Sequence, residues 1–146
     1  MKKFFLALTL LCTVFTFSAF ANDVKVSNKV LSAFEVSFNK ASNVKWAKVK
    51  SLYQAQFTMD NEQYSAYFDA DGAMVVVARF ITVGQLPLSL KTALKEEAGN
   101  NEVAYLFELS DEEGVHYYAT IEKEGKKKML RSMGNKKWVP YSKVKI

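Results

Sequence analysis

Residues 53–72 read YQAQFTMDNEQYSAYFDADG, and the predicted fold rests mainly on the pattern of these residues. Aromatic or other apolar residues occupy every second position over 53–59 and again over 64–68. A period of two is typical of β-strands with one buried face. The polar connections 60–62 and 69–72 contain the Asn, Asp and Gly residues that short hairpin turns favour. The stretch therefore predicts two neighbouring strands of an antiparallel meander.

The same period extends to both sides of this stretch. Val44 and Trp46 alternate upstream, and residues 74–80 form an apolar run downstream, so four strands are expected. Before the first strand the period changes to that of an amphipathic helix, which is predicted over about residues 26–40. The apolar stripe of this helix consists of Val26, Val30, Ala33, Phe34, Phe38 and Ala41.

The pattern then begins again. Leu86 and Pro87 open a second predicted helix, because proline is tolerated in a first turn where its missing N–H has no helical partner. Gly99 ends this helix, since glycine accepts the left-handed backbone that follows many helices. Its apolar stripe consists of Leu86, Leu90, Ala93, Leu94 and Ala98. Further strands are predicted at 103–109, 117–121, 126–133 and 136–144.

Helix plus four strands thus occurs twice, and the two halves superpose with an offset of about sixty residues. The predicted fold class is α+β, with two tandem helix-plus-antiparallel-meander repeats at about residues 24–83 and 84–146. Each helix is expected to cover one face of its strands. The repeats would then form one helix-covered sheet whose opposite face is open.

The phase of the alternation separates core positions from positions on the open face. Four aromatic residues of the first meander share their phase with two alanines, which suits a sheet face beneath a helix that carries Phe34 and Phe38. These residues are Tyr53, Phe57, Tyr64 and Phe68, with Ala55 and Ala66. Tyr67 and Tyr118 are out of phase with their core neighbours. They are candidates for a partner-binding patch, the alternative being ordinary surface tyrosines.

Residues 1–21 have the pattern of a secretory signal peptide. Two lysines precede an apolar run over 4–17, and Ala19-Phe20-Ala21 supplies a small-x-small cleavage site. The mature chain is expected to begin at Asn22 and to reside in the periplasm or outside the cell.

A lipid-modified Cys12 is the alternative form of export. Leu11 precedes this cysteine where a lipoprotein signal needs a small residue, so cleavage after Ala21 and a mature protein without a membrane anchor are favoured. The mature chain then contains no cysteine. This excludes a disulfide scaffold, a zinc–cysteine site and a cysteine nucleophile.

The single histidine and the carboxylates indicate no catalytic or metal site. His116 stands in a predicted strand, where a solvent-facing position needs no partner, and no spacing gathers carboxylates around it. Asp69-x-Asp71-Gly72 begins like a calcium loop but lacks the later ligands, so a hairpin turn is predicted. Residues 111–114 are predicted to form a solvated loop. We expect no catalytic residue, no metal and no cofactor.

The net charge of +5 is unevenly distributed along the chain. Residues 123–146 carry nine basic side chains against Glu124, a local charge of +8, while the rest of the mature chain carries −5. The binding candidates here are Lys126, Lys127, Lys128, Arg131, Trp138 and Tyr141. Export argues against nucleic acid as the partner and favours an anionic envelope polymer or an acidic protein surface. Alternatively, lysines on terminal strands prevent edge-to-edge aggregation and bind nothing.

Five motifs follow one another along the chain. They are Phe34-x-x-x-Phe38, Asn43-Val44-x-Trp46, Tyr53-x-Ala55-x-Phe57, Tyr64-x-Ala66-x-Phe68-Asp69-x-Asp71-Gly72 and Ile81-Thr82-Val83-x-Gln85-Leu86-Pro87. In this order and spacing they resemble the PepSY-like, beta-lactamase-inhibitor-like secreted proteins of Bacteroidota, over nearly the whole mature chain. The sequence departs from the family at Asn39, where proline is usual, so the first helix is expected to run slightly further here.

The resemblance implies a fold like that of beta-lactamase inhibitor protein and a role in binding or restraining peptidases or other envelope proteins. It supplies no catalytic residues, and a fold alone does not fix a function. Two functions stay open. The first is an exported, non-enzymatic module that binds a protein or peptide through its open sheet face, as an inhibitor or otherwise. The second is a cationic envelope-polymer-binding protein that uses residues 123–146.

Overall fold

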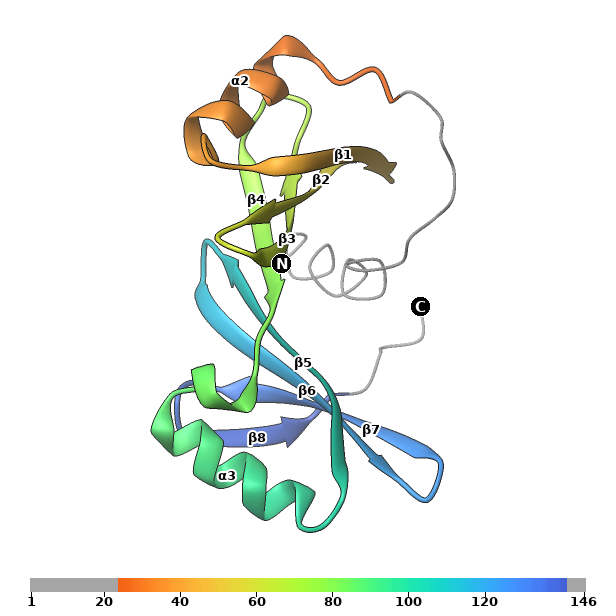
Figure 1. Ribbon diagram of the computed structural model, residues 1–146, viewed down its shortest axis with the longest axis vertical. Helices are drawn as coiled ribbons and strands as arrows, with labels where there is room; N and C mark the ends of the chain where they lie inside the picture. The colour runs from red at the N-terminus through yellow and green to blue at the C-terminus, as the bar shows by residue number, and fades with distance from the viewer. Residues whose placement is uncertain (1–23, 142–146) are drawn as a thin grey trace. The chain divides into compact units, whose positions relative to one another are not determined.

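A computed structural model describes residues 24–141, so the predicted signal peptide lies outside the described residues. The described part of the chain divides into two compact units, the first ending at Arg79 and the second beginning at Phe80. The strands are antiparallel and their order follows the chain from β1 to β8, with one helix before each set of four (Figure 1). This confirms the predicted α+β fold class. Neither of the two described helices is long and apolar enough to cross a membrane.

The first unit begins with a helix that is shorter than predicted. Its elements are α2 (Asn28–Ser37), β1 (Ser42–Val49), β2 (Leu52–Met59), β3 (Glu62–Phe68) and β4 (Met74–Phe80). The helix starts after Ser27, whose side chain accepts a hydrogen bond from the Val30 N–H as an N-cap. It ends before Phe38, whose φ of −135° leaves the helical region. The predicted limits of 26 and 40, and the extension past Asn39, are therefore wrong.

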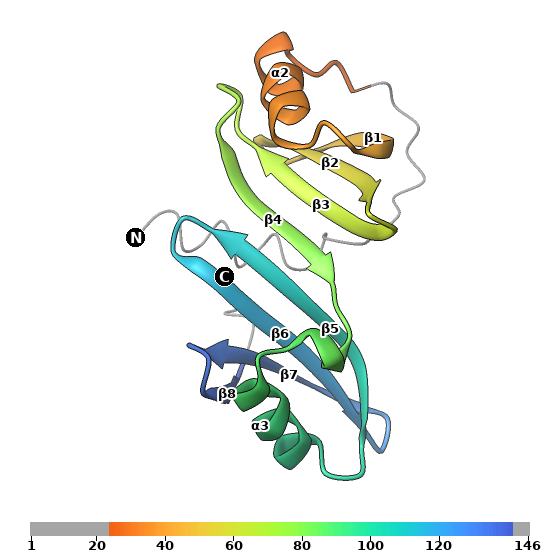
Figure 2. The same ribbon diagram turned by 60° about the vertical axis from the view of Figure 1, so that its left-hand side comes forward.

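The core of the first unit lies between α2 and one face of its strands (Figure 2). Ala55 and Ala66 are register partners and fully buried, and two such small residues leave room for the Phe34 ring. That ring contacts Phe57 edge-on at 5.1 Å and Trp46 edge-on at 5.3 Å between centroids. The predicted core of the first meander is confirmed.

The connection between β3 and β4 is a turn, as predicted. Asp69 Oδ1 accepts hydrogen bonds from the N–H groups of Asp71 and Ala73, both at 2.9 Å. Gly72 has a φ of +87°, and a Cβ at this position would lie 2.9 Å from the Lys29 carbonyl oxygen. The turn therefore needs glycine for both its backbone conformation and its packing on α2.

The second unit contains a short 3₁₀ helix before its longer helix. Its elements are η1 (Val83–Gln85), α3 (Leu88–Ala98), β5 (Glu102–Asp111), β6 (Gly114–Lys123), β7 (Lys126–Met133) and β8 (Lys137–Pro140). Pro87 is the N-cap of α3, so the helix starts later than the predicted Leu86. Gly99 ends it with a φ of +57°, as predicted. Strand β8 is shorter than the predicted 136–144, and residues 142–146 lie outside the described range.

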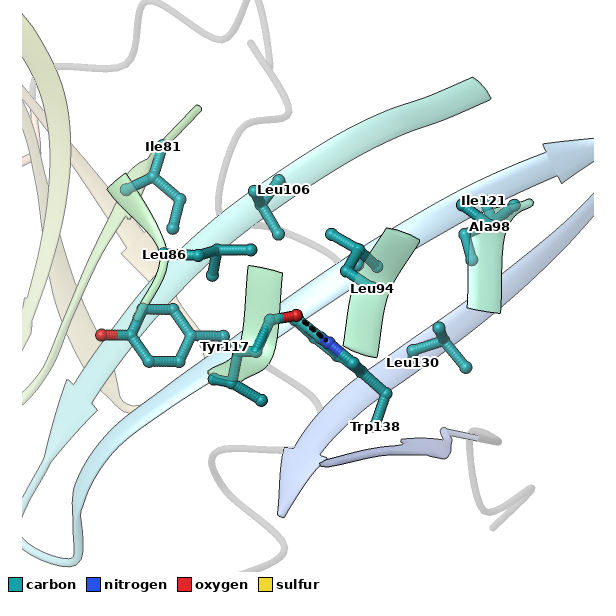
Figure 3. Packing of buried hydrophobic residues seen from close by; sticks show 11 residues of the cluster. Ile81, Leu86, Leu94, Ala98, Leu106, Tyr117, Ile121, Leu130 and Trp138 are labelled. Atoms are coloured by element: carbon teal, nitrogen blue, oxygen red, sulfur yellow. Dashed lines mark hydrogen bonds between the residues drawn. The ribbon is translucent and has the colours of Figure 1, made fainter. Parts of the chain in front are cut away.

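The core of the second unit lies between α3 and one face of its strands (Figure 3). Leu90 and Leu94 of α3 pack with Ala119 of β6 and Leu130 of β7, and each is at most 1% exposed. The indole Nε1 of Trp138 donates a hydrogen bond of 3.0 Å to the Leu90 carbonyl oxygen (Figure 3). A buried indole N–H needs such an acceptor, so this bond fixes β8 against the helix.

This packing predicts a large difference between two leucines of α3. Leu90 is fully buried and Leu88 is 79% exposed. Leu90→Ala should lower the free energy of unfolding by about 2–5 kcal/mol because it leaves a cavity in the core. Leu88→Ala, the matched control, should change it by no more than about 0.5 kcal/mol. Urea unfolding followed by circular dichroism measures both, and equal effects would contradict the assignment of the buried helix face.

Candidate functional site

The candidate site is the face of β5, β6 and β7 that points away from α3. Leu106, Ala119 and Leu130 belong to the core under α3, and alternate residues of a strand point to opposite faces. Phe107, Tyr118 and Arg131 are register partners across the three strands and therefore lie together on the other face. A sheet face without its own helix usually carries polar residues. Here it carries the large aromatic side chains of Phe107 and Tyr118 beside polar ones such as Arg131.

Four residues form what we call the aromatic–arginine cluster: Phe107, Tyr118, Arg131 and Tyr141. The rings of Phe107 and Tyr118 are stacked, with centroids 5.1 Å apart and planes 9° from parallel. Tyr141 contacts Tyr118 edge-on at 5.3 Å. The Arg131 guanidinium carbon lies 5.9 Å from the Tyr118 ring centroid, within cation–π range. The cluster is thus held by contacts among its own members.

The two tyrosines predicted for the open face lie on the expected faces but are buried. Tyr118 is 5% exposed. In the first unit, Tyr67 points away from α2 and is fully buried, and its hydroxyl lies 2.8 Å from Gln54 Nε2, which also donates to Ser65 Oγ. The expectation that these side chains are exposed is wrong, because aromatic stacking buries the first and a polar network holds the second.

Trp138 is the predicted site residue that the structure places elsewhere. It is 5% exposed and belongs to the core under α3, with its indole N–H bonded to the helix. Its side chain therefore lies beneath α3, on the face of the sheet opposite the candidate site. Tyr141, its predicted neighbour, instead belongs to the aromatic–arginine cluster. Trp138 is therefore not part of the candidate site.

The basic run of β7 does not form one strip. Lys128 lies on the α3 side, where its Nζ is 2.9 Å from a Glu97 carboxylate oxygen. Lys127 lies on the opposite face, with its Nζ 4.0 Å from Glu122 and 5.6 Å from the Tyr105 ring centroid. Because strand residues alternate between faces, consecutive lysines separate. Two of the three lysines in this run thus face carboxylates rather than a common surface.

His116 lies at one end of the same sheet face, near the turn of the β5–β6 hairpin. Its Nδ1 is 3.4 Å from Arg131 Nη2, and its Nε2 is 3.8 Å from Asp111 Oδ1. The Nε2 atom is buried without a hydrogen-bond partner. The His116 side chain is only 19% exposed, so the prediction of a solvent-facing position is wrong.

The hairpin brings carboxylates to this histidine, which the sequence reasoning missed. Asp111 and Gly114 are register partners around a two-residue turn, and Asp111 Oδ1 accepts a hydrogen bond of 2.8 Å from the Glu113 N–H. Potential ligand atoms of Asp111, Glu113 and His116 all lie within 4.8 Å of one another. The sequence signal was the spacing Asp-x-Glu-Gly-x-His, because the hairpin turn within it brings His116 close to Asp111.

A shallow cavity in the first unit is a weaker candidate. It lies beside the irregularity near the start of β1 and has a volume of about 200 Å³. Its lining is Asn43, Lys45, Gln56, Phe57, Thr58, Gln63 and Tyr64. Ligand pockets usually enclose about 300–1,000 Å³, so this cavity is small for a substrate site.

This environment makes the Tyr118 hydroxyl a weaker acid. Burial raises the pKa of Tyr118 above its ordinary value, because the charged phenolate loses solvation. The Arg131 guanidinium opposes this effect, while the carboxylates of Asp111 and Glu113 add to it. The pKa therefore reports on the aromatic–arginine cluster and on the hairpin turn together.

Solved structures from three Bacteroides species have similar folds. A proposed periplasmic protein from Bacteroides eggerthii matches with a TM-score of 0.72 and 17% identity, over 78% of this chain and 86% of that chain. A BLIP-like protein from Bacteroides fragilis matches with a TM-score of 0.64 and 21% identity, over 72% of this chain and 75% of that chain. A DUF2874 family protein from Bacteroides ovatus matches with a TM-score of 0.70 and 17% identity, over 77% of this chain and 86% of that chain.

These likenesses confirm the fold that the motifs predicted. No protein-family model matches the chain, and no curated protein matches it significantly. At identities of 21% or less, the solved structures show a shared architecture and leave the activity of this chain open.

The environment of Tyr118 predicts a pH effect on stability. The folded protein retains the Tyr118 proton to a higher pH than the unfolded chain, whose tyrosines titrate near 10. The contribution of this proton to the free energy of unfolding is fully present below about pH 10. It is lost as the pH rises through the pKa of Tyr118 in the folded protein. The difference between ultraviolet titrations of wild type and Tyr118→Phe should have a midpoint above 10. A midpoint equal to that of the chain in denaturant would contradict the prediction.

Proposed function

We propose that this chain is an exported, non-enzymatic binding module that engages a protein or peptide through the sheet face opposite its helices. The observation that carries the proposal is the aromatic–arginine cluster on the face that points away from α3. Tyr and Arg are among the residues that contribute most to binding energy at protein interfaces. A rigid aromatic group also loses little conformational entropy when it binds.

Exposed residues at the margin of the cluster supply the first contacts. Tyr105, on the same face of β5 as Phe107, is 52% exposed, and Met133, on the same face of β7 as Arg131, is 58% exposed. Methionine adapts its shape to different partners, and tyrosine offers both a ring and a hydroxyl. Tyr67 in the first unit is a second candidate contact, reached only if the partner uncovers it.

The place of action is the periplasm or the exterior of the cell. The signal-peptide pattern of residues 1–21 supports export. The structural likeness to a proposed periplasmic protein agrees with it. The likeness to a BLIP-like protein agrees with a binding role, and inhibition of a target enzyme is the more specific form of that role.

Binding of an anionic envelope polymer is the second function, and the geometry favours it less. The lysines of the basic run alternate between faces, and Lys127 and Lys128 face Glu122 and Glu97. Exposed ion pairs of this kind contribute little to stability, but they reduce the charge offered to a polyanion. This function would depend on Lys126, on Lys136 in the β7–β8 turn and on Lys137 of β8.

Partner capture with matched variants tests the proposal. The mature protein is immobilised, exposed to envelope extract, and compared with Tyr105→Ala and with Leu88→Ala on the outer side of α3. We expect Tyr105→Ala to weaken retention of a specific partner about 5- to 30-fold and Leu88→Ala to leave it unchanged. Both residues are exposed, so neither change should affect folding.

Salt separates the two functions. Capture by the aromatic face should persist at high ionic strength, whereas polymer binding should collapse there and on charge reversal at Lys126–Lys128. Equal retention by wild type and Tyr105→Ala, or repeated failure to retain any partner, would count against the proposed face.

A further inference from the structure

The turn of the β5–β6 hairpin gathers three side chains that bind metal ions elsewhere in proteins. We propose that Asp111, Glu113 and His116 form a binding site for a first-row divalent transition-metal ion, with Zn²⁺ as its representative. The site contains one imidazole nitrogen and two carboxylates. It is independent of the proposed partner-binding role, and it departs from the sequence-based expectation of no metal.

The distances between the ligand atoms suit a shared ion. Zinc bonds to nitrogen and carboxylate oxygen measure about 2.0–2.2 Å, so two ligand atoms on one tetrahedral ion lie roughly 3.3–3.6 Å apart. His116 Nε2 and Asp111 Oδ1 are 3.8 Å apart, which requires a shift of a few tenths of an ångström. The widest ligand separation is below 4.8 Å. Glu113 is exposed, so rotation of its side chain closes the remaining gap.

Two of the three ligands are already held in place. Asp111 and His116 are 15% and 19% exposed, and the hydrogen bond from the Glu113 N–H to Asp111 Oδ1 orients the carboxylate. Outer hydrogen bonds of this kind increase metal affinity by fixing the ligand. His116 Nε2 is a buried nitrogen without a hydrogen-bond partner, and such atoms in native structures call for an explanation. A metal ion bound to this atom provides one.

The donor set selects the class of metal. Imidazole nitrogen suits zinc, copper, nickel and cobalt, whereas calcium and magnesium prefer sites made of oxygen alone. Three protein ligands leave at least one position on the ion for water or for a group from another molecule.

Arg131 opposes the metal through both its charge and its contact with the histidine ring. A guanidinium group can donate hydrogen bonds but cannot accept them. Because Arg131 Nη2 lies 3.4 Å from His116 Nδ1, Nδ1 acts as the acceptor and the ring proton is on Nε2. Metal binding needs the lone pair of Nε2 and moves the proton to Nδ1, which ends this contact. Arg131 retains its position over the Tyr118 ring. Removal of the guanidinium should therefore strengthen metal binding, an effect that adventitious binding to carboxylates elsewhere on the chain would not show.

The single histidine of the chain makes the test direct. Zn²⁺ is titrated into the purified protein while the ring nitrogens of His116 are followed by NMR and the heat by calorimetry. We expect saturable one-to-one binding, with the ring proton moving from Nε2 to Nδ1. Ca²⁺ at the same concentrations should leave the ring signals unchanged. Unchanged ring signals at excess Zn²⁺ would overturn the site.

Variants provide the second arm of the test. Asp111→Asn and His116→Ala should weaken Zn²⁺ binding by at least about 10-fold, since even outer partners of metal ligands contribute about 10- to 100-fold. Arg131→Gln should bind several-fold more tightly, and Asp71→Asn in the β3–β4 turn should match wild type. Circular dichroism checks that each variant folds. Wild-type affinity in Asp111→Asn and His116→Ala, or weaker binding by folded Arg131→Gln, would contradict the proposal.

Discussion

The packing of each helix against alanines in the middle strands is the interaction on which the rest of each unit depends. Ala55 and Ala66 lie beneath the Phe34 ring, and Ala119 lies in the cluster that contains Leu90 and Leu94. A larger residue at these fully buried positions would push the helix away from the sheet. The large side chains of the helix fit because the sheet supplies small ones there.

The same strands must place their remaining side chains on the opposite face. In the second unit these are Phe107, Tyr118 and Arg131, and the Tyr118 ring contacts both of the others. A charged hairpin turn with Asp111 and His116 lies at the end of this face. The second unit therefore has one face that serves stability and one face whose chemistry suits recognition of a partner and of a metal ion.

The sequence was sufficient for the strands and for the core beneath the helices. Alternation in Tyr53–Phe57 and Tyr64–Phe68 is a local property, and the structure reproduces it in register. Helix ends were less predictable because they depend on caps: Ser27 and Phe38 shorten α2, and Pro87 stands before α3. The burial of Trp138 depends on a hydrogen bond to Leu90, 48 residues away, which no local pattern reveals.

The candidate site was predictable only in part. The phase of the alternation correctly placed Tyr67 and Tyr118 on the faces away from the helices. The exposure of a side chain also depends on its neighbours in other strands, and both tyrosines are buried. The run of lysines at 126–128 suggested a strip, although alternation alone shows that it divides. The Asp111–His116 grouping needed the exact hairpin register, because a shift of one residue would have turned these side chains to opposite faces.

In the proposed function, the sheet face opposite α3 recognises the partner of this protein. Hydrogen–deuterium exchange with and without a captured partner measures the contacted surface most directly. We predict slower exchange in β5, β6 and β7, strongest near residues 105–109 and 117–120, with exchange in α3 unchanged. Slower exchange confined to the outer side of α3, around Leu88, would contradict it.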